Sequence, residues 1–189
     1  KEKGAKEVCT LYQDDEFGQE VMKGAEEGLK GAGMSLAEKT TYKRGATDFS
    51  SQIAKLKAEN CDMVVLGTII RETIGAIGTA RKLGYNPIFL GSSASYTDLI
   101  HKLGGKAMDG LISTMTVQNP YTDETSQPIR FWANKYKTKF NEDPSVFSVY
   151  GYALVDTFIL AAQKAGPNLN TDSFVKAMNN LTVPPDIFG

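Results

Sequence analysis

The sequence is short of the residues that metal sites and most catalytic centres require. Its 189 residues include two cysteines and one histidine. Two cysteines cannot form a metal site by themselves, and the histidine, His101, has no cluster of carboxylates or cysteines beside it. We therefore expect no metal, no cofactor and no catalytic role for His101.

Neither sign of charge is in excess, since 21 lysines and arginines face 22 aspartates and glutamates. A basic surplus is typical of proteins that bind nucleic acid or anionic membranes, so we expect no nucleic-acid partner. No uninterrupted apolar run is long enough to span a bilayer. No charged segment with an apolar stretch behind it opens the chain, so any export signal has been removed or never existed.

Common catalytic motifs are also absent, including the glycine-rich dinucleotide and phosphate loops and the G-x-S-x-G elbow. Asp14-Asp15, after the first expected strand, would suit a phosphorylated receiver domain. Such a domain also needs an aspartate after the third strand, where Leu66-Gly67-Thr68 stands instead. We interpret Asp14-Asp15 as turn and helix-start carboxylates favoured by the helix dipole, with a ligand contact by one of them as the alternative.

The two cysteines flank the interior of the expected sheet. Cys9 falls inside the first expected strand, and Cys61 directly precedes another. We interpret them as two small buried apolar side chains. A disulfide is the less favoured alternative, because neighbouring parallel strands seldom offer the Cβ geometry that it needs.

What the sequence does contain is a regular alternation of strands and helices. Residues 8–12 form a short apolar run, and apolar residues at helical spacing begin at Phe17, after a tight polar link. Right-handed crossovers between successive strands give a parallel sheet. The sequence therefore predicts an α/β fold, a doubly wound parallel sheet with helices on both faces. The expected strands are 8–12, 34–42, 62–67, 87–91 and 111–117.

After Thr116 the pattern becomes helical. Residues 150–165 are apolar almost all round, which requires burial of most of that helix. No second set of strands is present to bury it. We therefore expect the sequence to be part of a longer chain, with a domain-swapped or co-folded partner as the less favoured alternative.

The carboxyl ends of the expected strands form the candidate site, because such sheets bind ligands there. The loops at this edge offer hydroxyls, backbone amides and apolar faces, but no nucleophile with a base. We expect a recognition surface and not an enzyme; loop or core packing is the alternative for each residue. The candidate residues are Phe17, Thr68, Ile69, Ile70, Ser92 and Ser93.

Several segments, in this order and spacing, resemble one known family. They are YQDDEFGQ, GATDFSSQIAKLKAENCDMVVLG, ARKLGY, FLGS and DPSVFSVYGYALVD. The family is that of the solute-binding proteins of branched-chain amino acid-type ABC transporters, which have the type I periplasmic binding fold. The resemblance implies a periplasmic or otherwise extracytoplasmic receptor of two lobes, which closes around a small-molecule ligand and presents it to the membrane subunits of an ABC permease.

The resemblance also divides the chain. Residues 5–117 resemble the second α/β lobe. Residues 118–189 resemble the hinge crossing and the C-terminal helices that pack on the first, N-terminal lobe. The sheet of that lobe is missing from this sequence, which would explain the uncovered helices.

Individual residues carry over only in part. Phe17 stands where the family has a ligand-contacting aromatic residue, Ile69 at a lining position that is often aromatic, and Phe147 at an apolar pocket position near the hinge. Ser93 departs from the pattern, because receptors for aliphatic amino acids have a carboxylate there to hold the ligand's ammonium group. The residues that could supply this carboxylate instead are Asp14, Asp15 and Glu72.

The ligand is therefore expected to be an amino acid or, given Ser93, an aromatic or other carboxylate. The competing function is a cytoplasmic ligand-sensing regulator on the same fold. A nucleotide-dependent enzyme is disfavoured, since the glycine fingerprint is absent.

Overall fold

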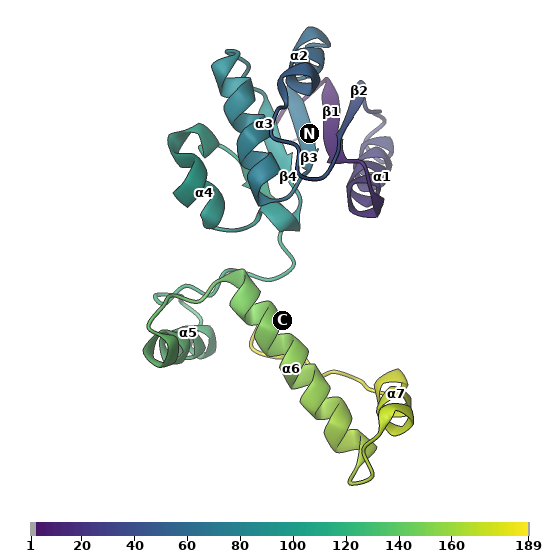
Figure 1. Cartoon of the computed structure of the whole chain (residues 1–189), viewed down its shortest axis with the longest axis vertical. Coiled ribbons are helices and arrows are strands. Elements are labelled where there is room, and N and C mark those ends of the chain that lie inside the picture. The colour runs from purple at the N-terminus through teal and green to yellow at the C-terminus, as the bar shows by residue number, and fades with distance from the viewer. Residues whose placement is uncertain (1–2, 189) are drawn as a thin grey trace. The chain divides into compact units, whose positions relative to one another are not determined.

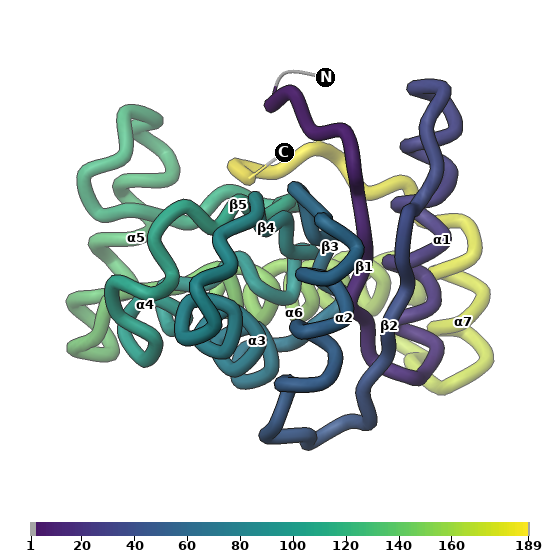
Figure 2. Tube along the Cα trace, turned by 90° about the horizontal axis from the view of Figure 1, so that it is seen from above, coloured from purple at the N-terminus to yellow at the C-terminus, as the bar shows by residue number. Residues whose placement is uncertain are grey.

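Five parallel strands form one sheet in the order β2-β1-β3-β4-β5, which Figure 2 shows from β2 on the right to β5 on the left. The structure is a computed structural model that describes residues 3–188. Its chain divides into two compact units, Lys1–Thr116 and Val117–Gly189, and each is considered by itself. The strands are β1 (Val8–Gln13), β2 (Glu38–Tyr42), β3 (Met63–Gly67), β4 (Ile88–Gly91) and β5 (Ile112–Ser113).

Helices cover both faces of this sheet, so the α/β doubly wound prediction is confirmed (Figure 1). One face carries the core, which lies under helices α2, α3 and α4. Helix α1 covers the other face. Its residue Val21 lies beside Gly67, next to the side chain of Tyr12, which points to that face. The helices are α1 (Glu16–Lys30), α2 (Ser50–Ala58), α3 (Ile70–Lys82) and α4 (Leu99–Gly104), with short 3-10 turns at Ser93–Ser95 and Gly105–Met108.

The core forms where paired strands present apolar residues in register. Cys9 lies opposite Val64, and Leu11 lies opposite Leu66. Because alternate residues of a strand face opposite sides, these four side chains share one face, and all are fully buried. Residues of α2, α3 and α4, with Phe49 directly before α2, complete the core. They are Phe49, Ile53, Leu56, Ala76, Ile77, Ala80 and Ile100.

Two strands are shorter than the sequence pattern predicts by several residues, and the partner strand explains each. The second begins at Glu38 and not at 34, because its partner β1 begins at Val8 and pairs Cys9 with Glu38. The fifth ends at Ser113 and not at 117, because β4 ends at Gly91, which pairs with Ser113. Residues beyond the end of the partner strand have no backbone groups beside them with which to form strand hydrogen bonds.

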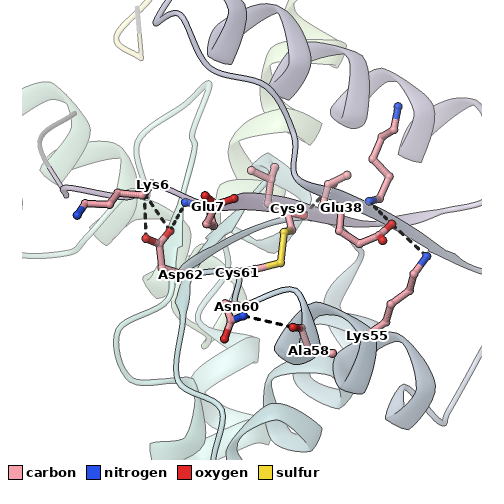
Figure 3. The surroundings of a disulfide bond; sticks show 12 residues. Lys6, Glu7, Cys9, Glu38, Lys55, Ala58, Asn60, Cys61 and Asp62 are labelled. Carbon is pink, nitrogen blue, oxygen red and sulfur yellow. Dashed lines mark hydrogen bonds and ion pairs between the residues drawn. A yellow bond between two sulfur atoms is a disulfide. The ribbon is translucent and has the colours of Figure 1, made fainter.

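The interpretation of the cysteines as separate apolar side chains is wrong, because Cys9 and Cys61 form a disulfide (Figure 3). Their Cα atoms are 5.9 Å apart, an ordinary distance for a disulfide. Cys61 is not on β3 but in the turn before it, where its amide donates to the carbonyl of Leu56. The argument against neighbouring strands therefore does not apply, since this turn brings Cys61 over the core face of β1.

All the regular secondary structure in the described part of the second unit, residues 117–188, is helical, as predicted. Helix α6 begins four residues earlier than the predicted start at 150, so Phe147 lies on the helix itself. A reciprocal pair of hydrogen bonds between Ser145 and Ser148 caps that start. The helices are α5 (Gln127–Phe140), α6 (Val146–Ala165) and α7 (Thr171–Asn179).

Helix α6 is apolar but mostly uncovered, so the predicted burial does not occur within this chain. Val146, Val149 and Ala161 are buried, yet Leu154 is 72% exposed. At 100° per residue the exposed apolar residues gather on one side of the helix. We call this side the α6 stripe, and it consists of Phe147, Leu154, Val155, Phe158 and Ile159.

By length and composition alone, α6 also qualifies as a membrane-crossing helix, among the residues that the structure describes. The absence of a long uninterrupted apolar run in the sequence therefore did not exclude such a helix. Asp156 stands near the middle of α6, and a carboxylate at the centre of a bilayer is costly. The α6 stripe is better suited to packing against protein.

Candidate ligand-binding site at the carboxyl edge of the sheet

The carboxyl ends of three adjacent strands lie side by side in the first unit. Tyr12 of β1 pairs with Gly67 of β3, and Leu66 pairs with Gly91 of β4. The loops that leave these strands therefore start at one edge, where parallel sheets bind ligands. Six of the seven predicted site residues lie in these loops or in the first turns after them, namely Phe17, Thr68, Ile69, Ile70, Ser92 and Ser93.

Phe17 is the second residue of α1 and is half-buried. Asp15 caps the helix, and its Oδ1 accepts a hydrogen bond of 3.1 Å from the amide of Gly18. This bond, followed by one from the side chain of Gln13, holds the pKa of Asp15 below its usual value. The pair Asp14-Asp15 thus includes the predicted helix-start carboxylate, and Asp14 forms an ion pair with Lys43.

In the loop after β3, the hydroxyl of Thr68 is bonded to another side chain of the protein. Thr68 is fully buried, and its Oγ1 lies 2.6 Å from Oγ1 of Thr73. Because the Thr73 hydroxyl gives its one proton to the carbonyl of Ile69, Thr68 is the donor between the two threonines. The half-buried Ile69 caps α3, whereas Ile70 packs against the core. Of the three, Ile69 has the side chain best placed to meet a ligand.

The third loop is a run of small polar residues after β4. The Ser92 hydroxyl accepts from the amide of Ala94, and the Ser95 hydroxyl donates to the carbonyl of Ser92 at 2.8 Å. Ser93 begins the 3-10 turn and is half-buried. It offers a hydroxyl but provides no charge.

A hollow of about 310 Å³ lies beside the Ser92 loop. Its wall is mostly apolar and comes from α1 and strands β3 and β4. Phe17, Thr68 and Ile69 do not line it, so it is separate from the other two loops. The lining residues are Val21, Gly24, Ala25, Val65, Leu90, Gly91, Ser92 and Thr114.

Three buried polar residues near this edge were not predicted as a group. Tyr42 and Gln13 are each 3% exposed, and the Tyr42 hydroxyl donates to Gln13 Oε1 at 3.3 Å. Glu72, in the first turn of α3, is 2% exposed, and its Oε2 has no hydrogen-bond partner among residues 3–188. Burial, and next the negative charge of Glu72, raise the pKa of Tyr42 well above its usual value.

These residues carry little local signal in the sequence. Tyr42 lies 29 positions from Gln13, so no short motif joins them. A polar Gln13 at the end of a fully buried strand is the one feature that could have drawn notice. Phe147, the seventh predicted residue, belongs to the second unit, where it is about half exposed and its ring lies 5.9 Å from that of Tyr150.

The edge has the chemistry of recognition. In residues 3–188, no group of three or more histidine, cysteine, aspartate or glutamate side chains could hold a metal ion. The hydroxyl of Thr68 is bonded to Thr73 of α3, and that of Ser92 accepts from the amide of Ala94. Neither has a histidine or other base as its partner. The arrangement can present an aromatic ring, apolar side chains and backbone groups to a ligand.

Comparisons with known proteins agree with this architecture. A family model described as "Periplasmic binding protein" matches residues 1–189. The Leu/Ile/Val-binding protein homolog 8 of Brucella abortus is 23% identical over 181 residues, which cover 94% of this chain and 45% of that protein. The chain thus spans about half the length of the curated relatives that it matches.

Solved structures show the same fold at low sequence identity. A fatty acid ABC transporter substrate-binding protein from Thermomonospora curvata superposes with a TM-score of 0.85 at 21% identity, over 97% of this chain and 48% of that one. A substrate-binding periplasmic protein from Ralstonia solanacearum gives a TM-score of 0.81 at 23% identity, over 94% and 51% of the two chains. With the family model matching from end to end, the chain belongs to the periplasmic binding protein family, of the type I fold.

Proposed function

We propose that this chain is part of an extracytoplasmic solute-binding receptor that captures a small organic ligand and delivers it to the membrane subunits of an ABC permease. The observation that carries the proposal is the carboxyl edge of the sheet, in a chain of the periplasmic binding protein family. That edge offers an aromatic ring and loop amides but no catalytic pair. The protein is therefore a binding protein and not an enzyme.

The disulfide favours this function over the cytoplasmic regulator. Structural disulfides form and persist in oxidising compartments and are rare in the cytosol. Cys9 and Cys61 are both buried, at 0% and 2% exposure, so this disulfide is part of the hydrophobic core. A cytoplasmic protein would keep the same two side chains as thiols.

The uncovered α6 stripe supports a second lobe outside this sequence. The stripe extends from Phe147 to Ile159, which is about 18 Å along the 20-residue helix at 1.5 Å per residue. Exposed apolar faces of this size mark interaction surfaces. We infer that the missing N-terminal lobe covers the stripe, that residues 5–117 form the other lobe, and that the two close on the ligand by hinge motion.

We expect the 189-residue chain alone to bind the dye ANS several-fold more strongly than the full-length protein does, because the α6 stripe is open only in the former. Fluorescence titration at equal molar concentration measures the difference. The matched variant Leu154→Ser/Phe158→Ser should reduce dye binding by the chain alone. Equal dye binding by the two proteins would mean that no lobe covers the stripe.

The ligand is proposed to lack an ammonium group that must be neutralised at position 93. Ser93 has no charge to offer, and a buried ion without a partner costs several kcal/mol. Burying an aromatic ring contributes roughly 4–6 kcal/mol gross from apolar transfer. We therefore favour aromatic and other carboxylates over aliphatic amino acids.

A thermal-shift screen of the full-length protein tests this choice. Phenylacetate, 4-hydroxybenzoate and other small carboxylates are compared with L-leucine and L-valine. Stabilisation by the aromatic acids supports the proposal. Stabilisation by leucine or valine, with no response to the aromatic acids, would contradict the ligand class but keep the receptor function, whereas an enzymatic turnover of any bound compound would contradict the function.

Phe17→Ala is expected to weaken binding of the best compound in that screen by on the order of tenfold to a hundredfold, the loss of about 1.5–3 kcal/mol of apolar contact. Isothermal titration calorimetry measures the change. The control is Leu103→Ala, which removes a side chain that is 67% exposed on α4. Equal affinities for the two variants would remove Phe17 from the site.

A further inference from the structure

A chain of side-chain hydrogen bonds runs from the core to the first turn of α1. The Tyr42 hydroxyl donates to Gln13 Oε1 at 3.3 Å, and Gln13 Nε2 donates to Asp15 Oδ2 at 2.5 Å. Asp15 Oδ1 then accepts from the amide of Gly18 at 3.1 Å. The bonds join the ends of β2 and β1, the loop between β1 and α1, and the helix that carries Phe17.

An amide side chain suits the middle of this chain, because it has both an acceptor and a donor. Gln13 accepts from Tyr42 through Oε1 and donates to Asp15 through Nε2. The Tyr42 hydroxyl also lies 3.4 Å from the carbonyl oxygen of Gly67, a second acceptor for the same proton. A glutamate has two acceptors and no donor when ionised, and a leucine has neither. Gln13 is 3% exposed, so water cannot easily replace a lost partner.

The inner end of the chain is firmly held. The ring of Tyr42 packs edge-on against Phe49, with ring centroids 5.4 Å apart, and both rings are buried. The amide of Asp14 also donates to the carbonyl of Tyr42 at 2.8 Å. The position of Gln13 is thus fixed from the core side.

The outer end determines where Phe17 stands. Both carboxylate oxygens of Asp15 are engaged, one by Gln13 and one by Gly18. Phe17 lies between Asp15 and Gly18 in the sequence, so the bonds on either side leave its backbone little freedom. A half-buried ring held in this way loses less conformational entropy when a ligand packs against it.

We propose that Gln13 is a positioning residue of the ligand site: through Asp15 it holds the first turn of α1, and with it the ring of Phe17, in the orientation that meets the ligand. This inference rests on the proposed function, because it takes Phe17 as a ligand contact. The affinity for an aromatic or apolar ligand group then depends on a buried glutamine that does not touch the ligand.

An exchange of donor and acceptor tests the proposal at nearly constant shape. Gln13→Glu places a carboxylate against that of Asp15, and Asp15→Asn places an amide against that of Gln13. In the double variant Gln13→Glu/Asp15→Asn, the carboxylate at 13 can accept from both Tyr42 and the new amide at 15. The hydrogen-bond chain is then restored with its middle bond reversed, and the amide oxygen at 15 still accepts from Gly18.

The first readout is calorimetric titration of the full-length variants with phenylacetate and with L-leucine. Each single variant is expected to bind the active probe about tenfold more weakly, and the double variant to recover to within about threefold, as for a coupled pair in contact. The control Gln19→Glu makes the same change at an exposed residue of α1 and should leave affinity unchanged. A double variant no better than the two singles would overturn the proposal.

The second readout needs no ligand. Hydrogen exchange at the Gly18 amide should accelerate in Gln13→Glu, remain near the original rate in Gln19→Glu, and return in the double variant. Unchanged exchange in Gln13→Glu would show that Gln13 does not position this turn. If neither probe binds the unmodified protein, the proposed ligand site fails, while the exchange rates still decide whether Gln13 orders the turn of Phe17.

Discussion

Breaking the Cys9–Cys61 disulfide is expected to lower the free energy of unfolding of the sheet-containing unit by about 4 kcal/mol. The two cysteines are 52 residues apart in the sequence, so the bond closes a long loop in the unfolded chain. Closing such a loop removes conformational entropy from the unfolded state, and longer loops lose more. The loop includes most of β1 together with α1, β2 and α2.

The measurement is urea unfolding of the full-length protein, with and without dithiothreitol, beside the double variant Cys9→Ala/Cys61→Ala. Reduction should shift the midpoint of the unmodified protein to lower urea and leave that of the variant unchanged. A thiol assay should find no free thiol in the oxidised, unfolded protein. Two free thiols, or no effect of reduction on the midpoint, would contradict the bond and remove its support for an extracytoplasmic location.

The disulfide shows what a periodic pattern cannot predict. The sequence pattern placed Cys9 inside one strand and Cys61 directly before another, but it did not show where the Cys61 side chain points. The structure places it in a turn fixed by the Leu56 carbonyl. Pairing of two cysteines depends on the direction of their Cβ atoms in three dimensions, and that direction depends on such turns.

The same distinction applies to the strands. The sequence pattern predicted all five strands: short apolar runs indicated buried strands such as β1 and β3, whereas polar alternation indicated the more exposed edge strand β2. The lengths of β2 and β5 were wrong, because a strand ends where its partner ends, as Gly91 ends the ladder for residues after Ser113. The partner's length is not a property of the strand's own sequence.

The sequence predicted where the candidate site lies, but not which of its side chains are free to contact a ligand. Topology alone brings the loops after β1, β3 and β4 to one edge. Which side chains remain available there depends on neighbours that only the folded chain supplies. Thr68 is bonded to Thr73 and Ile70 packs on the core, whereas Phe17 stays partly exposed. The contact between Gln13 and Tyr42 joins two strands and leaves no motif.

Gly18→Ala is expected to lower the free energy of unfolding by about 3 kcal/mol, at the upper end for a substitution that overfills a packed site. A Cβ atom at position 18 would lie 1.9 Å from the carbonyl oxygen of Gln13 and 2.6 Å from its nitrogen. These are backbone atoms of a central strand, so no side chain can move aside. Helix α1 must shift away from β1 to admit the methyl group.

Gly28→Ala provides the matched control on the same helix. A Cβ at position 28 meets nothing within 4 Å, and alanine in a helix is more stable than glycine by roughly 0.5–1 kcal/mol. The two substitutions are chemically identical, so opposite signs in urea unfolding isolate the contact with Gln13. Equal effects of the two would mean that α1 does not rest on the end of β1 as described.

The displacement caused by Gly18→Ala should also reach the ligand site. Moving the first turn of α1 stretches the bond from the Gly18 amide to Asp15 and carries Phe17 with it. We expect this variant to bind phenylacetate, or whichever screened acid binds best, at least tenfold more weakly at a temperature where it remains folded. Gly28→Ala should bind as the unmodified protein does. If Gly18→Ala lowers stability but leaves the affinity unchanged, the contact of the Phe17 ring with the ligand does not depend on how α1 packs on β1.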